Sequence, residues 1–194
     1  MRTLHATAVL IMLGAGPTVA EAPQWIVDDE NSRITFIAKQ MQVPVAGRFE
    51  KFTATIRFDP DDLSGSRASI DIDVASVSTP NSDIELEIKR SPWFDVEHFP
   101  IARFVTTGIR ARGDKAYEAV ASLTIRDVTM EVVLPFTVDI SPDPSDSNVL
   151  VAHATGELTV SRLAFGIGQG EWKATSIVAD SVVIHIDVIS RRKK

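Results

Sequence analysis

The stretch Tyr117–Val138 reads YEAVASLTIRDVTMEVVLPFTV and alternates apolar and polar side chains with a period of two. One face of its first half consists of Tyr117, Ala119, Ala121, Leu123 and Ile125. One face of its second half consists of Val128, Met130, Val132, Leu134, Phe136 and Val138. A period of two is typical of a strand with one buried and one solvated face. The stretch therefore predicts two successive strands that share one apolar interior.

The same alternation recurs through most of the chain after residue 30. It predicts about eight long strands, placed near residues 34–38, 52–58, 70–74, 102–110, 117–126, 128–140, 150–160 and 182–188. Breaks or loops are expected at residues 43–47, 59–65, 142–146 and 166–170. Evenly spaced antiparallel strands of this kind predict an all-β sandwich or an up-and-down barrel. A barrel of about eight strands is large enough to hold one small ligand.

The segment from Asn81 to Trp93 departs from the period of two and is the single predicted helix. Ser82 is its expected N-cap, with Glu85 three residues later, as in a capping box. Pro92 is expected to end the helix because proline lacks the amide proton that a helix interior requires.

The first 20 residues have the features of a secretory signal peptide: Arg2, an apolar run at residues 8–13, and small residues up to Ala20. The apolar run is shorter than the roughly 20 residues that a membrane-spanning helix needs. We therefore expect residues 1–20 to be removed and residues 21–194 to form one domain, located in the periplasm or secreted.

Composition excludes several functions. The formal net charge is −6, which disfavours binding to nucleic acid because phosphates require a basic surface. The chain has no cysteine, so disulfides, thiolate catalysis and cysteine-based metal sites are excluded. The one basic run, Arg191–Lys194, is read as a solvated tail, with a membrane-surface contact as the alternative. The sequence does not indicate an oligomeric state.

No residue pattern predicts catalysis or metal binding. His98, His153 and His185 lie far apart in the sequence without metal-ligand spacing, and the last two fall on faces assigned to solvent. The carboxylates mostly alternate outward, and the apolar faces contain no acid. We therefore predict no catalytic residue and no metal site.

The predicted interior contains small residues in the middle of two strands, namely Ala119, Ala121, Ala152, Ala154 and Gly156. These residues indicate either room for a ligand or close packing between strands. The glycine run Gly166–Gly170 is weak as a phosphate loop because no helix pattern follows it. Its glycines favour a loop with positive φ at the barrel rim, with direct ligand contact as the alternative.

An aromatic cluster follows the predicted helix. Trp93 and Phe94 stand close in sequence to Phe99 and Phe104. They are interpreted as a plug that packs at the barrel mouth, or as an apolar gate for a ligand.

At these positions the chain resembles the YceI-like family of exported lipid-binding proteins, over essentially the whole of residues 21–194. The matching pieces, in order, are Trp25–Asp28 with Ser32 and Phe36, Gly47–Phe49 with Phe52, Phe58-Asp59, Ile72 to Thr79, Trp93–Asp95, Phe99-Pro100 with Ala102 and Phe104, Leu123–Arg126, Leu134–Phe136, Phe165–Gly168, and Val178–Asp180 with Val182. The sequences at Trp93–Asp95 and Gly168–Trp172 are similar to those of the family subgroup whose members are often found beside a membrane cytochrome b561.

The resemblance implies a lipocalin-like antiparallel barrel with one short helix against it, and a tunnel for a polyisoprenoid or quinone-type lipid. It implies no agreed enzyme activity. The chain departs from the family pattern at Glu85, Glu87 and Asp127, where the family commonly has Asp, His and Gly. The change at Glu87 removes any histidine-based site from the helix.

Three functions follow as hypotheses. The first is a carrier or store for an isoprenoid lipid, with nine candidate ligand-binding residues: Phe36, Phe52, Phe58, Trp93, Phe94, Phe104, Leu123, Phe136 and Phe165. In this set Trp93 and Phe94 form the gate. The second is a partner or regulator of a membrane redox protein such as a cytochrome b561, without a bound lipid. The third is an enzyme acting on the lipid, which requires a polar cluster inside the tunnel.

Overall fold

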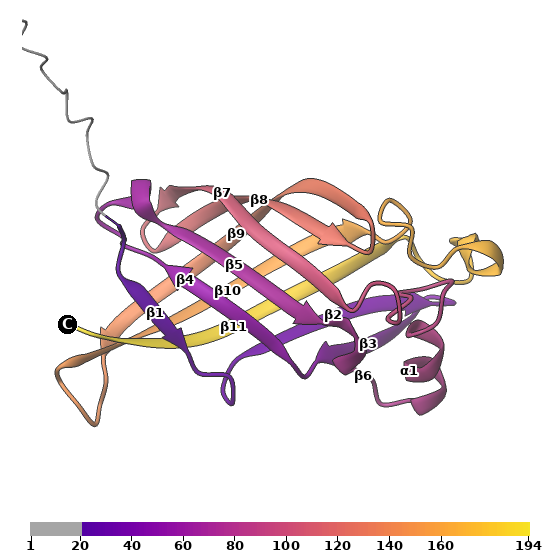
Figure 1. Ribbon diagram of the computed structural model, residues 1–194, viewed down its shortest axis with the longest axis horizontal. Helices are drawn as coiled ribbons and strands as arrows, with labels where there is room; N and C mark the ends of the chain where they lie inside the picture. Colours follow the sequence, from indigo (N-terminus) through magenta and orange to yellow (C-terminus); the bar gives the residue numbers. More distant parts are fainter. Residues whose placement is uncertain (1–20) are drawn as a thin grey trace, which may run out of the picture.

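A computed structural model of the protein describes residues 21–194, and the predicted signal peptide at residues 1–20 lies outside the described residues. The described chain forms an antiparallel barrel with a helix at one end (Figure 1). The strands are β1 (Gln24–Val27), β2 (Arg33–Gln40), β3 (Val43–Phe49), β4 (Phe52–Arg57), β5 (Arg67–Asp73), β6 (Val77–Ser78), β7 (Ile101–Gly113), β8 (Ala116–Ile125), β9 (Val128–Pro142), β10 (Val149–Ser161) and β11 (Ser181–Lys193). The helical elements are α1 (Ser82–Ile88) and the short 3-10 turns η1 (Leu63–Gly65), η2 (Val74–Ser76) and η3 (Gly170–Lys173).

The eleven strand segments make a closed barrel of eight strands. Eight neighbours follow the order β1-β4-β5-β7-β8-β9-β10-β11, and β1 pairs with β11 to close the ring. The other three segments are β2, β3 and β6, which extend β1, β4 and β5 at the α1 end. There β2 pairs with β11, β3 with β2, and β6 with β3. The predicted eight-stranded antiparallel fold with one short helix is confirmed.

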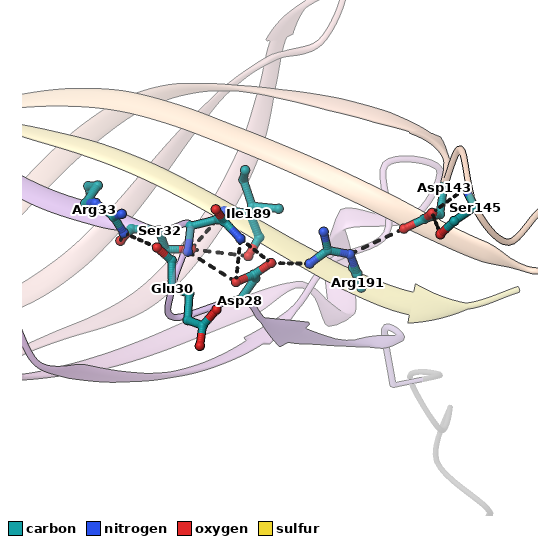
Figure 2. Close-up of polar contacts among 9 residues, drawn as sticks. Asp28, Glu30, Ser32, Arg33, Asp143, Ser145, Ile189 and Arg191 are labelled. Atoms are coloured by element: carbon teal, nitrogen blue, oxygen red, sulfur yellow. Dashed lines mark hydrogen bonds and ion pairs between the residues drawn. The ribbon is translucent and has the colours of Figure 1, made fainter.

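A bend separates β1 from β2, and polar contacts tie it to β11 (Figure 2). The Ser32 hydroxyl donates to the carbonyl of Ile189 at 3.3 Å and accepts the amide of the same residue at 3.0 Å. The guanidinium of Arg191 binds the carboxylate of Asp28 and, at 3.4 Å, that of Asp143. The bend therefore stays against the barrel wall, and both segments keep β11 as their neighbour.

The predicted break at residues 43–47 is wrong, because these residues belong to β3. Gly47 lies opposite Phe36 in the β2–β3 pair. A Cβ at Gly47 would lie only 2.7 Å from an atom of the Phe36 ring. Pro44 is tolerated because this part of β3 pairs with β2 alone within residues 21–194. The glycine makes room for an aromatic ring and does not interrupt the strand.

The predicted helix is present but shorter, and its cap differs. α1 ends at Ile88, and the cap is Asn81, whose side chain accepts the amides of Asp83 at 2.9 Å and Ile84 at 3.4 Å. Glu85 binds the Lys89 ammonium at 3.0 Å and does not close a capping box with Ser82. Asn and Ser are both strong caps, so the sequence alone does not separate two adjacent candidates.

The interior face of β8 is as predicted, since Tyr117, Ala119, Ala121, Leu123 and Ile125 are all buried. On β9, Leu134 and Val138 are buried, but Met130 is 40% exposed, which corrects its predicted interior position. Met130 lies near the start of β9, beside the two-residue turn from β8, so it is at the barrel rim.

Candidate ligand-binding cavity

The barrel encloses two cavities whose walls consist mainly of apolar side chains. Cavity 1 lies at the α1 end and has a volume of about 340 Å³. Cavity 2 lies towards β1 and has a volume of about 160 Å³. Four residues belong to the walls of both cavities, namely Ile34, Ile72, Leu123 and Ile184. The cavities therefore abut at this waist, one behind the other along the barrel.

The register of β11 gives the combined length of the cavities. Val182 lines cavity 1, Ile184 lines both cavities, and Ser190 lines cavity 2. The strand from Val182 to Ser190 extends about 27 Å at about 3.4 Å per residue. Strands in such barrels tilt by about 40°, so the lined region is about 20 Å long parallel to the barrel axis. This length suits an extended apolar chain better than a compact ligand.

All nine predicted ligand-binding residues lie on the cavity walls. Cavity 1 contains Phe36, Trp93, Phe94 and Phe165. Cavity 2 contains Phe52, Phe58, Phe104 and Phe136. Leu123 is one of the four waist residues. The structure thus brings the nine residues together around one apolar interior, and their contact with a ligand stays a prediction.

The small interior residues were interpreted either as room for a ligand or as close packing between strands, and the structure supports each interpretation at different positions. Ala119, Ala152, Ala154 and Gly156 all line cavity 2, which supports the interpretation that they leave room. A Cβ at Gly156 would also lie 2.9 Å from the carbonyl oxygen of Pro135, so this glycine permits close packing with β9 as well. Ala121 is fully buried and lines neither cavity.

The β1 end of the barrel contains a packed aromatic cluster. The rings of Phe58 and Tyr117 meet edge to face with centroids 5.1 Å apart, and Phe136 lies 5.5 Å from Tyr117. Nε1 of Trp25 donates to the carbonyl of Phe58 at 2.9 Å. Burial raises the pKa of the Tyr117 hydroxyl, with smaller contributions from Asp114 and Asp61.

At the opposite end, α1 and the loop that precedes β11 lie together (Figure 1). Gly166, Gly168 and Gly170 have φ values of 70°, 72° and 64°, which confirms the predicted positive-φ loop. The amide of Gly168 donates to the carbonyl of Pro92 at 2.7 Å, so the loop is bonded directly to the segment after α1. A Cβ at Gly168 would overlap the guanidinium of Arg162.

Arg162 is a buried residue that the sequence prediction missed. Its side chain donates to five backbone carbonyls at 2.7–3.0 Å: Ala179, Ile167, Gly168, Trp172 and Val178. Burial lowers the pKa of Arg162, and the charge of Asp180 partly opposes this shift. The sequence could have indicated this burial. Leu158 and Val160 face inward on β10, and Arg162 comes two residues later, so the period of two places it on the same face.

Arg126 performs a similar structural role at the β8–β9 turn. Its Nη1 donates to the carbonyls of Ser91, Trp93 and Gly166 at 3.2, 2.8 and 2.9 Å. Arg126 and Arg162 therefore hold both loops of this end by their backbone oxygens.

Two acids belong to the wall of cavity 1, and both come from α1 and not from the apolar strand faces, for which no inward acid was predicted. Asp83 and Glu87 stand on the face of α1 that also presents Ile84 and Ile88. Asp83 is exposed, and half-buried Glu87 binds Arg90 at 3.1 Å. Both carboxylates therefore lie at the rim of the cavity. The helical period of four places them there, which an alternation of two does not anticipate.

Two buried indole N–H groups, on tryptophans that help to line cavity 1, have no hydrogen-bond partner among the described residues. They are Nε1 of Trp93 and Nε1 of Trp172, and both atoms are buried. The two rings are packed together, with centroids 5.5 Å apart.

The three histidines among residues 21–194 lie outside the cavities. His153 binds Asp187 at 2.7 Å and His185 lies 3.4 Å from Glu157, both on the outer surface as predicted. Within residues 21–194, no group of three or more His, Asp or Glu side chains is arranged to hold a metal ion. No helix in the described part of the chain is long and apolar enough to cross a membrane.

Known proteins resemble this chain over most of its length. The sequence profile of the YceI-like domain matches residues 25–189. The crystal structure of Burkholderia cenocepacia BcnA is 35% identical, with a TM-score of 0.77, over 84% of this chain and 98% of that protein. A polyisoprenoid binding domain from Saccharophagus degradans, implicated in plant cell wall breakdown, has the same fold with 14% identity and a TM-score of 0.66, over 88% of this chain and 98% of that domain. A UPF0312 protein of Vibrio vulnificus is 21% identical over 136 residues, which are 69% of this chain and 71% of that protein.

Proposed function

The chain belongs to the YceI-like family, and from this premise we propose that it is an exported binding protein for a polyisoprenoid or quinone-type lipid. The lipid lies in the barrel, which serves as a carrier or store. The observation that carries the proposal is the pair of abutting apolar cavities, which extend about 20 Å along β11 and include the nine predicted residues in their walls. The polyisoprenoid binding domain of Saccharophagus degradans, which shares the fold, supports the same class of ligand.

Burial of the apolar chain supplies the binding free energy. Each Å² of apolar surface removed from water contributes about 25 cal/mol, so a lipid that buries roughly 400 Å² gains about 10 kcal/mol before the costs of ordering. The waist at Leu123 and Ile184 carries no polar group, so the chain can pass from cavity 1 into cavity 2 without desolvating one.

The direct test is to purify the protein from its exported fraction, extract it with organic solvent and identify the extract by mass spectrometry. We expect an isoprenoid lipid in stoichiometric amount. A matched pair of variants locates the site. Ala119→Phe fills cavity 2 and should reduce the retained lipid, whereas Ser122→Phe on the outer face of β8 should not. A lipid-free wild-type protein that also fails to take up added isoprenoid overturns the proposal.

Export is part of the same proposal. Residues 1–20 act as the signal peptide, and the mature protein begins at Glu21. Cell fractionation followed by N-terminal sequencing tests this directly. A cytoplasmic protein that retains Met1 contradicts it.

A membrane cytochrome b561 is proposed as a partner that exchanges the lipid. Support comes from the residues Trp93–Asp95 and Gly168–Trp172, which the structure brings to one end of the barrel. In the alternative, the protein is a partner of the redox protein but binds no lipid. That alternative requires a barrel filled by its own side chains, and the two cavities disfavour it. Capture of the cytochrome from membranes by lipid-loaded but not lipid-free protein separates the two.

We propose binding without turnover. The acids nearest to the ligand, Asp83 and Glu87, lie at the rim of cavity 1 and not beside the buried chain. An isotope-labelled isoprenoid incubated with the protein should be recovered with its mass unchanged. A product of altered mass that disappears in the Glu87→Gln variant supports an enzyme instead.

A further inference from the structure

The turn between β2 and β3 presents apolar side chains to solvent at the α1 end (Figure 1). Met41 is 72% exposed and Val43 is 63% exposed, and both lie in the uncharged stretch from Gln40 to Ala46. Leu86 of α1 is 60% exposed and does not line cavity 1. Single exposed apolar side chains are common in soluble proteins, but here several protrude at one end of the barrel.

The backbone of this turn is costly for the residues that occupy it. Met41 and Gln42 have φ values of 50° and 66°, in the left-handed region that asparagine and glycine adopt more easily. Two hydrogen bonds fix the turn in place. The amide of Met41 donates to the carbonyl of Ile177 at 2.7 Å, and the amide of Ala179 donates to that of Lys39 at 2.8 Å. Folding alone therefore does not explain an exposed methionine at this position.

The turn and α1 border the mouth of cavity 1. Lys39 and Gln40, just before the turn, line this cavity, and so do Asp83 and Glu87 of α1. Lys39 and Asp83 are exposed, so the cavity reaches the surface between the two elements. The outer edge of β3 at residues 43–47 has no strand partner within residues 21–194, so no sheet closes this side. A lipid that passes through the mouth leaves the barrel beside the protruding apolar side chains.

The exposed charges around this mouth are balanced. Lys39 and Lys173 are exposed there, and so are the acids Asp83 and Glu171. A surface of this kind does not attract one sign of charge. Contact through its apolar side chains should therefore depend little on the charge of the partner or on salt.

A phospholipid bilayer fits this surface better than a protein does. Specific protein complexes bury about 800 Å² on each partner, far more than a few separate side chains supply. Apolar side chains that project from a fixed turn and a helix can insert among lipid head groups instead. The neighbouring cavity agrees with this choice, because the proposed ligand dissolves in membranes and not in water.

We propose that the turn Met41–Val43, together with Leu86, docks the protein on a phospholipid bilayer with the mouth of cavity 1 facing the membrane. This inference rests on the proposed lipid-binding function and adds the place where the lipid is exchanged. The lipid moves between membrane and cavity past apolar side chains and does not cross water. The opposite end, with Ile26 and the basic run Arg191–Lys194, points away from the membrane.

Binding to phosphatidylcholine vesicles, measured by flotation, tests the docking surface. Met41→Asn combined with Gln42→Gly removes the apolar side chain and supplies residues that favour positive φ. We expect the vesicle partition coefficient to fall about tenfold while the midpoint of urea unfolding rises. A folding defect cannot produce this combination. An unchanged partition coefficient overturns the inference.

Ile26→Gln is the matched control, because Ile26 is also 72% exposed but lies on β1 at the other end of the barrel. It should leave the partition coefficient within about twofold of wild type. Lys193→Gln combined with Lys194→Gln tests the basic run and should also have no effect. Binding that requires anionic phosphatidylglycerol, disappears in about 0.5 M NaCl or is lost in the lysine variant overturns the inference.

The way in which the lipid is delivered separates this inference from the proposed function. A ubiquinone with a geranylgeranyl tail is offered either in detergent micelles or in phosphatidylcholine vesicles. The variant with Met41→Asn and Gln42→Gly should take up this lipid like wild type from micelles, but about fivefold more slowly from vesicles. Equal rates of uptake from vesicles reject the docking surface and leave the lipid-binding function intact. A wild-type protein that takes up the lipid from neither source rejects the proposed function itself.

Discussion

The two ends of the barrel both contain buried tryptophan, but they satisfy it differently. At the β1 end, Nε1 of Trp25 donates to Phe58 and the neighbouring rings pack tightly. At the α1 end, Trp93 and Trp172 have their backbone carbonyls bound by arginines while their N–H groups are unpaired within the described chain. A satisfied donor contributes to stability, and an unsatisfied one costs stability unless a ligand accepts from it. The comparison indicates that the β1 end is stabilised by paired and packed aromatic side chains, whereas the α1 end depends on the backbone hydrogen bonds of Arg126 and Arg162.

The largest expected effect concerns the support of the α1 end. Arg162→Met removes the donor of five backbone carbonyls in a buried position. We expect a loss of about 3–5 kcal/mol in the free energy of unfolding, measured by denaturant titration. Arg103→Met is the control, because the ion pair of Arg103 with Asp71 lies on the exposed outer face and should contribute less than about 1 kcal/mol. Equal losses in the two variants contradict the role given to Arg162.

A second pair of variants tests how tightly the glycine loop is constrained. Gly168→Ala should cost about 2–3 kcal/mol, because it combines a positive φ with overlap against Arg162. Gly166→Ala has a similar φ but no neighbouring atom within 4 Å of the added Cβ, so it should cost only about 1 kcal/mol. Thermal unfolding of both variants gives the difference. A cost for Gly166→Ala as large as that for Gly168→Ala means that the overlap has no energetic consequence.

The comparison of the tryptophans themselves comes next in size. Trp25→Phe leaves the Phe58 carbonyl without its donor and should lower the free energy of unfolding by about 2 kcal/mol. Trp172→Phe removes a donor that is unpaired in the described chain, so the ligand-free protein should lose less than about 1 kcal/mol. Chemical denaturation of delipidated protein measures both. The reverse order of the two losses contradicts the comparison.

The smallest effect is a pH dependence beside the α1 end. The Asp95 carboxylate accepts a hydrogen bond from Nδ1 of His98 at 2.9 Å, and this bond together with the carboxylate charge raises the pKa of His98 above its ordinary value of 6.5. The protonated form is therefore favoured in the folded state, so its contribution is fully present below pH 6.5 and is lost as the pH rises through the raised pKa. NMR titration of His98 should show that Asp95→Asn lowers this pKa. An unchanged pKa in that variant rejects Asp95 as the cause.

Residue periodicity predicts the fold and the cavity wall well. The alternation along β8 and β11 depends on burial alone, so Leu123 and Ile184 could be placed in the interior from the sequence. The error at residues 43–47 arose because Gly47 reads locally as a breaker, while its function is to admit the ring of Phe36 from the paired strand. Contacts of that kind depend on the partner strand and are not encoded in the segment itself.

The polar features of the site could be predicted only in part. Arg162 continues the inward pattern of β10, so its burial was within reach of the sequence. Its five carbonyl partners come from a loop with no regular period, and the meeting of Trp93 with Trp172 depends on the same loop. Unpaired N–H groups arise from this tertiary arrangement, so no pattern along the chain predicts them.

The most direct test of the account is a crystal structure of the delipidated protein soaked with a ubiquinone that has a geranylgeranyl tail. The account predicts that the ligand occupies both cavities. The tail then passes Leu123 and enters cavity 2. A ligand bound only on the outer surface, with both cavities empty, would contradict it.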